Sequence, residues 1–221
     1  MTHTIDAPLA TAAVPPSTRP ATRALVAGGI LAGPLFLGLG MVQGLTRDGF
    51  NFTRNAISQL SLGDLGWIQI AGFLLTGVLV IAGAVGMRRV LGATTGGTWA
   101  PRLVGVFGAS FLLAAVFTAD PGGGFPAGAP DDHAASLSPH GAVHMLSGMV
   151  GYLALCAAFL VLARHFAARR HRGWALGSRL VPLGVLVGFA GSSATVLAFT
   201  AGAGLGLLWL TAVTARLAAE A

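Results

Sequence analysis

Six long apolar runs, separated by polar segments, set the pattern of this chain. They cover residues 24–45, 67–87, 101–119, 141–166, 179–199 and 203–218. The first five are each close to the roughly 20 residues that a helix needs to cross a bilayer at about 1.5 Å per residue. The sixth is the shortest. The pattern predicts an all-α protein, a bundle of six transmembrane helices.

The chain before the first apolar run has a different character. Residues 1–22 are rich in Ala, Thr and Pro and show no apolar period. The run that follows them is too long for the apolar core of a typical signal peptide. We therefore expect a disordered tail over residues 1–22 and a six-span transmembrane domain over residues 23–219.

Arginines are distributed unevenly between the apolar runs. All 13 basic residues are arginine, and 11 of them lie in alternate polar segments, beginning with the N-terminal tail. The segments between these hold only Arg47 and Arg54. Because arginine concentrates in cytoplasmic segments, both termini and the tail are predicted to be cytoplasmic. The Ala-, Gly- and Arg-rich composition is typical of a bacterial source, which makes the inner cell membrane the expected location.

Composition narrows the class of partner. The chain is 54% hydrophobic and 9% charged, whereas an ordinary soluble domain is roughly 25% charged. The net charge is +6, but the chain lacks the basic stripe with interleaved aromatic residues that favours binding to nucleic acid. No nucleic-acid partner is therefore expected. The bilayer is the expected partner, with anionic lipid headgroups at the cytoplasmic arginines of 164–179. No pattern points to a particular protein partner.

Polar residues on the outward side gather where the third run ends and the fourth begins. Asp120 follows the third run, and the fourth opens with His140 and His144. At helical spacing these histidines share a face with Ser147 and Gly151, and that face should point into the bundle. The opposite face is aliphatic, with Val143, Leu146, Val150 and Leu153.

Three interpretations fit this face. In the first, Asp120, His140 and His144 bind zinc and leave a position open for water, as in a metal-dependent membrane hydrolase. In the second, a site without metal binds a lipid-like or small polar ligand; its candidate residues are Arg54, Ser58, Ser61, Asp120, His140 and His144. In the third, the polar groups only join helices and loops, through interhelical hydrogen bonds and an ion pair of the Arg54–Asp120 type.

A short helix is also predicted on the outward side. Thr53 is predicted to cap this interfacial helix over residues 54–60, with Ile57 and Leu60 on one face.

A small transporter or a membrane partner subunit is a further functional alternative. Transport is not favoured, because no charge lies near mid-membrane and no inverted repeat is evident.

Three stretches carry a family resemblance: "RNAISQLSLGDLGW" before the second run, "FTADPGGGFPAG" at the end of the third and "SPHGAVH" at the start of the fourth. In this order the chain resembles the domain-of-unknown-function family 998, small prokaryotic membrane proteins, over about residues 24–218. The resemblance implies a six-helix membrane fold and no established activity.

A looser resemblance is to seven-span membrane hydrolases that join Ser, Asp and His residues around zinc. It implies a match of Ser58 or Ser61 with Asp120, His140 and His144. The chain departs from that group in having six spans and in carrying the histidine pair on the fourth. The sequence thus predicts an integral membrane protein with an outward-facing polar site, and leaves both a binding and an enzymatic role open.

Overall fold

The computed structural model describes residues 18–94, 96–129, 131 and 137–219. Helices dominate it, and within these ranges there is no β-strand. In chain order the elements are α1 (Thr18–Thr46), η1 (Ile57–Ser61), α2 (Gly66–Leu91), α3 (Trp99–Val116), α4 (Pro139–Ala168), α5 (Arg172–Ala190), η2 (Gly191–Ser193) and α6 (Val196–Ala218). The all-α prediction is confirmed. Most of the predicted tail, residues 1–17, lies outside the described residues, and α1 already begins at Thr18.

All six α-helices are long and apolar enough to cross a membrane. Large apolar side chains on their outer surfaces are exposed, among them Leu31 at 58%, Val78 at 57% and Leu183 at 58%. An apolar exterior of this kind is what a bilayer requires, whereas a soluble bundle would carry polar groups there. The chain is a multi-pass membrane protein.

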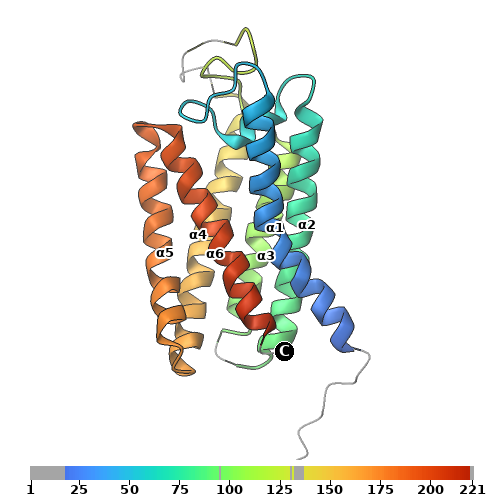
Figure 1. The fold of residues 1–221 in the computed structure, drawn as a ribbon, viewed down its shortest axis with the longest axis vertical. Helices are drawn as coiled ribbons and strands as arrows, with labels where there is room; N and C mark the ends of the chain where they lie inside the picture. The colour runs from blue at the N-terminus through green and yellow to red at the C-terminus, as the bar shows by residue number, and fades with distance from the viewer. Residues whose placement is uncertain (1–17, 95, 130, 132–136, 220–221) are drawn as a thin grey trace, which may run out of the picture.

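The helices form a closed ring. Each packs against its neighbours in the chain, and α6 packs against α1, which closes the bundle. Because successive helices run in opposite directions, the start of α1 and the end of α6 lie at the same end (Figure 1). A hydrogen bond across the closing contact, from the Thr211 hydroxyl to the Ile30 carbonyl at 3.1 Å, joins α6 to α1.

Glycines permit the closest helix contacts. A Cβ on Gly83 of α2 would come within 2.6 Å of the Gly29 Cα of α1. Gly188 of α5 meets Gly202 of α6 in the same way, at 2.7 Å. Small residues at such crossings let two backbones approach, which is how helices gain packing contact in a membrane.

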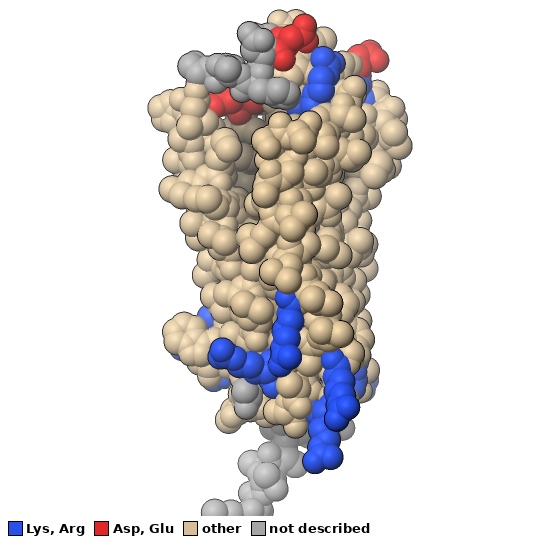
Figure 2. All heavy atoms as spheres, turned by 90° about the vertical axis from the view of Figure 1, so that its left-hand side faces the viewer, with Lys and Arg blue, Asp and Glu red and all other residues tan. Residues whose placement is uncertain are grey.

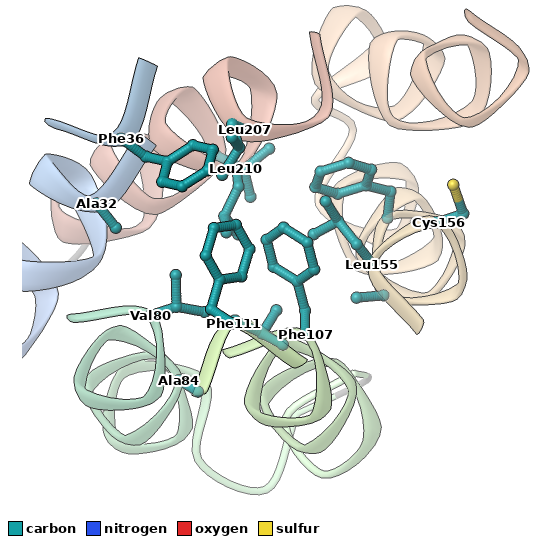
Figure 3. Close-up of a cluster of buried hydrophobic side chains, with 14 of the residues drawn as sticks. Ala32, Phe36, Val80, Ala84, Phe107, Phe111, Leu155, Cys156, Leu207 and Leu210 are labelled. Atoms are coloured by element: carbon teal, nitrogen blue, oxygen red, sulfur yellow. The ribbon is translucent and has the colours of Figure 1, made fainter. Parts of the chain in front are cut away.

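An aromatic cluster fills the centre of the ring. Phe36 of α1 lies edge-on to Phe111 of α3, with ring centroids 5.0 Å apart, and Phe107 meets Phe111 in the same manner at 5.1 Å. Leu207 and Leu210 of α6 reach the same cluster (Figure 3). Edge-to-face rings are worth about 0.5–1.5 kcal/mol beyond their buried area, so the cluster ties three helices together.

Charged residues lie at the two ends, with an uncharged belt between them (Figure 2). The carboxylate end holds every carboxylate of the described residues, and the only arginines found there are Arg47 and Arg54. The arginine end carries the other ten arginines whose side chains the structure describes: Arg23, Arg88, Arg89, Arg102, Arg164, Arg169, Arg170, Arg172, Arg179 and Arg216. The alternation of arginine-rich segments along the sequence therefore corresponds to two opposite ends of the bundle.

The predicted limits of the last two spans were wrong. The fifth span was placed at residues 179–199 and the sixth at 203–218, but α5 runs over Arg172–Ala190 and α6 over Val196–Ala218. The break falls at residues 191–195, a short Gly-, Ser- and Thr-containing segment where η2 forms and the Thr195 hydroxyl caps α6 by accepting from the Leu197 N–H. Long-window apolarity hides such a break, because the few small polar residues are averaged with the apolar residues on both sides.

Candidate functional site

Three loops interlock at the carboxylate end. They are residues 47–65, residues 117–138 and the short junction between α5 and α6. Thr53 joins the first loop to that junction, since its carbonyl accepts from the Val196 N–H at 3.0 Å and from the Thr195 hydroxyl at 3.2 Å. The described parts of these loops lie together at this end of the bundle (Figure 1).

Asn55 holds the second loop against the first. This side chain is fully buried and donates to the carbonyls of Gly122 at 3.0 Å and Gly123 at 3.3 Å. Gln59 adds bonds to the Asp120 carbonyl at 3.2 Å and the Gly122 carbonyl at 3.3 Å. Because buried amides are costly to leave unpaired, these contacts fix the position of residues 120–123.

Arg47 joins the beginning of the first loop to its later residues. Its guanidinium donates to the carbonyls of Leu60 and Leu62 and lies 4.9 Å from the centre of the Phe125 ring. Partial burial lowers the pKa of Arg47, and the nearby Asp64 carboxylate acts in the opposite direction. Two of the five N–H donors of this arginine are thus used within the protein.

Asp120 caps α4 from outside the helix. Its two carboxylate oxygens accept from the Ser138 N–H at 2.9 Å and the Ser138 hydroxyl at 2.5 Å. The Ser138 oxygen in turn accepts from the Gly141 N–H at 3.0 Å, as an N-cap residue does. A carboxylate beside the positive end of a helix dipole is also favourable. The sequence placed Asp120 close to the start of the fourth span and missed Ser138, its actual partner.

The two histidines differ in their surroundings. His144 is half-buried, and its Nδ1 lies 2.8 Å from the Phe117 carbonyl, so that nitrogen carries the proton and donates. His140 is exposed and lies beside the Phe117 ring, with ring centroids 5.2 Å apart. Both histidines therefore contact the end of α3.

The predicted inward face of α4 is largely confirmed. Ser147 and Gly151 are buried, and a Cβ on Gly151 would collide with the Ser110 side chain of α3. His140 departs from this face because it lies in the first turn of α4, where the loops leave it uncovered. On the opposite side, Leu146 and Leu153 are exposed, as predicted.

The geometry does not bring the predicted zinc ligands together. Among the residues that the structure describes, no group of three His, Cys, Asp or Glu side chains is placed to hold a metal ion. Both Asp120 oxygens bond to Ser138, and the His144 Nδ1 bonds to Phe117. Asp120 and His144 are thus bonded to Ser138 and to the end of α3, and the zinc site of Asp120, His140 and His144 stays a prediction.

The remaining predicted residues are spread over the same end. Arg54 pairs with Asp131, at 3.6 Å between nitrogen and oxygen, rather than with Asp120. Ser61 is buried and donates to the Ser58 carbonyl at 2.8 Å. Arg54 thus contacts the second loop, whereas Ser58 and Ser61 contact each other within the first loop.

The short helix predicted over residues 54–60 takes another form. A 3-10 turn, η1, covers Ile57–Ser61 and follows Ala56, so Thr53 does not cap it. Thr53 instead bonds to the Asn51 side chain through its N–H at 2.9 Å and its hydroxyl at 2.7 Å. Asn and Thr readily form such local turns, which compete with helix initiation. Ile57 and Leu60 are both buried, as the apolar pattern predicted.

One recess, with a volume of about 530 Å³, opens at the carboxylate end. Two loops line it, with Thr46, Arg47, Asp48, Gly63, Asp64 and Leu65 from one and Phe125, Pro126 and Ala127 from the other. Asp48 and Asp64 are exposed carboxylates at its wall. This recess lies beside the predicted site and shares none of its six residues.

Sequence reasoning also missed a buried amide pair. Gln43 of α1 donates through Nε2 to the Gln69 Oε1 of α2 at 2.7 Å, and the two side chains are 5% and 0% exposed. The remaining amide atoms, Gln43 Oε1 and Gln69 Nε2, have no partner within the described part of the chain. A single Gln in each of two apolar runs was the available signal for this contact.

One of the comparisons with known proteins gives a match. A family described as "Protein of unknown function (DUF998)" matches residues 30–216. No curated protein and no solved structure matches the chain.

Proposed function

Since the chain belongs to the DUF998 family of proteins of unknown function, we propose a function from the geometry of its carboxylate end. In this proposal the protein is a multi-pass cell-membrane protein that binds a small polar or lipid-like ligand on the outward side. The observation that carries the proposal is the recess between the loops, with two exposed carboxylates and an apolar rim.

The orientation follows from the charges. Ten of the twelve arginines whose side chains are described lie at the arginine end, which the positive-inside tendency assigns to the cytoplasm. Both chain termini are then cytoplasmic, and the carboxylate end with its recess faces outward. A bacterial inner membrane suits this arrangement.

The recess favours a ligand that carries an amine. Asp48 and Asp64 offer carboxylates, while the Arg47 guanidinium already donates to two backbone carbonyls. Leu65 is 49% exposed at the rim and can contact an apolar chain. A zwitterionic headgroup such as that of phosphatidylethanolamine combines these properties, because its amine pairs with carboxylates and its chains remain in the bilayer.

The sequence-predicted residues have a supporting role in this proposal. Asp120 and the buried Asn55 fix the loop whose later residues, Phe125 and Pro126, form one wall of the recess. His144 and Arg54 contact the two ends of the same loop, at the Phe117 carbonyl and at Asp131, whereas His140, Ser58 and Ser61 lie at the same end of the bundle. Pre-organised walls reduce the ordering that a ligand must otherwise impose on binding.

Lipid titration followed by native mass spectrometry tests the proposal. The probes are phosphatidylethanolamine and phosphatidylcholine, added to the purified full chain in detergent. We expect Asp48→Asn/Asp64→Asn to bind phosphatidylethanolamine about tenfold more weakly, a loss of about 1.4 kcal/mol. Asp131→Asn is the matched control, since its carboxylate is exposed at the same end outside the recess. Equal binding by both variants, or no preference for the amine lipid, would overturn the proposal.

A further inference from the structure

Arg170 adopts a backbone conformation that usually belongs to glycine. Its φ is 60°, and it is the only non-glycine residue with a positive φ among the described residues. It follows the last residues of α4, where the N–H of Arg170 bonds to the Ala167 carbonyl at 3.0 Å and the N–H of His171 to the Phe166 carbonyl at 2.9 Å. This bond pattern is the Schellman motif, whose left-handed position most often holds Gly.

The side chain at this position lines a second recess. The recess has a volume of about 360 Å³ and lies between the end of α4 and the start of α5. Its lining consists of Ala167, Arg170, Arg172, Ala175, Leu176 and Arg179. Three of the six lining residues are thus arginines, and the other three are apolar. Arg170 occupies this position although glycine would fit the backbone better, which points to a role for its side chain.

Among the described residues, the charged side chains that line this recess are all arginines. Within the described ranges, no hydrogen bond or ion pair is formed by the side chains of Arg170, Arg172 and Arg179, and all described carboxylates lie at the opposite end. Free guanidinium groups bind phosphate strongly, because their N–H groups match pairs of phosphate oxygens. The recess is therefore suited to a phosphate-bearing anion.

An apolar strip leads from the recess along α5 into the membrane belt. Leu176, Leu180 and Leu183 are 55%, 53% and 58% exposed, and their helical spacing places them on one face with Arg172 and Arg179. A phospholipid could place its phosphate at the arginines and its acyl chains along these leucines. A free phosphate ion would use only the first of these two surfaces.

We propose that the recess of Arg170, Arg172 and Arg179 is a specific binding site for the phosphate of an anionic phospholipid in the cytoplasmic leaflet. The site is separate from the amine-binding recess, and it lies at the opposite end of the bundle. It differs from general attraction between arginines and an anionic membrane in depending on these three side chains. Other arginines at the same end are outside it.

The test compares two charge-matched double variants of the full chain in detergent. Arg172→Gln/Arg179→Gln removes two guanidinium groups from the recess, and Arg89→Gln/Arg164→Gln removes two exposed ones elsewhere at the same end. Native mass spectrometry with added phosphatidylglycerol measures the affinity of each. We expect about tenfold weaker binding in the first variant and less than about a twofold change in the second.

Arg170→Gly separates binding from folding. Glycine suits the left-handed position, so this variant should melt at the wild-type temperature or above it and yet bind phosphatidylglycerol several-fold more weakly. A loss of affinity in this variant cannot then be assigned to unfolding. Wild-type affinity in Arg170→Gly and in the recess double variant would overturn the proposal.

Two further probes identify the source of the phosphate. Phosphatidylcholine in place of phosphatidylglycerol should bind more weakly and equally to both double variants, since its headgroup has no net charge. Inorganic phosphate should fail to displace phosphatidylglycerol at millimolar concentration. Displacement by inorganic phosphate would overturn the lipid assignment and indicate a site for free phosphate instead.

Discussion

The Asp120 carboxylate accepts two hydrogen bonds from one residue, the N–H and the hydroxyl of Ser138, at 2.9 and 2.5 Å. Through Ser138 it anchors the first turn of α4 to the end of α3. Asp120→Ala should lower the free energy of unfolding by about 1–2 kcal/mol, because it leaves a cap and a loop N–H unsatisfied. Thermal unfolding measures this, with exposed Asp131→Ala as a control expected to change it by less than about 0.5 kcal/mol. Equal effects of the two would contradict a capping role.

Gly141 lies directly against the Asp120 carboxylate. A Cβ on Gly141 would collide with the Asp120 carboxylate, whereas one on Gly148 of the same helix meets nothing within 4 Å. We expect Gly141→Ala to destabilise the protein and Gly148→Ala to stabilise it by about 0.5–1 kcal/mol. The loss at Gly141 should shrink in an Asp120→Ala background, which a double-mutant cycle measures. A loss that stays the same there would assign the effect to another contact.

Asn55 is the buried link between the two outer loops. Asn55→Ala removes donors from the Gly122 and Gly123 carbonyls and should cost about 1–3 kcal/mol. Hydrogen exchange over residues 117–129 should rise in this variant, because the second loop loses its attachment. Asn51→Ala, at an exposed position, is the control and should leave that exchange close to wild type. Unchanged exchange in Asn55→Ala would show that other bonds hold the loop.

The Gln43–Gln69 contact joins α1 to α2 near the carboxylate end. Replacing either residue with Leu leaves the other amide buried without its partner. Replacing both leaves no buried amide that needs a hydrogen-bond partner. The double-mutant cycle should give a coupling of about 0.6 kcal/mol and at most about 1.7 kcal/mol, the range found for side-chain bonds within membranes. Unfolding in detergent by a denaturant series provides the measurement. A coupling of zero would mean that each amide is satisfied separately.

The proposed orientation can be tested by labelling. Cys156 is the only cysteine of the chain and is buried, so single cysteines introduced at Asp131 and Arg89 report on the two ends. In intact cells, a membrane-impermeant maleimide should label Asp131→Cys and leave Arg89→Cys unlabelled until the membrane is opened. The reverse pattern would invert the topology and place both proposed recesses on the other side.

The sequence was informative where one physical rule decides the outcome. Length and apolarity of the runs predicted six helices, and the helical period placed Ser147 and Gly151 inside the bundle. The start of α6 was missed because the polar interruption before it, residues 191–195, is only a few residues long and was absorbed into one apolar run. The bonds of Asn55 and Asp120 were missed for another reason: their partners are loop groups whose position depends on the complete fold.

The contact that closes the ring has a consequence for biosynthesis. Helix α1 is made first and α6 last, yet a Cβ on Gly33 of α1 would touch both Thr211 and the Leu207 backbone of α6. Until the final span has been synthesised, this face of α1 lacks the helix against which it packs. Assembly can therefore finish only after translation of the last helix, and a nascent chain halted before residue 196 would expose an open seam to the insertion machinery.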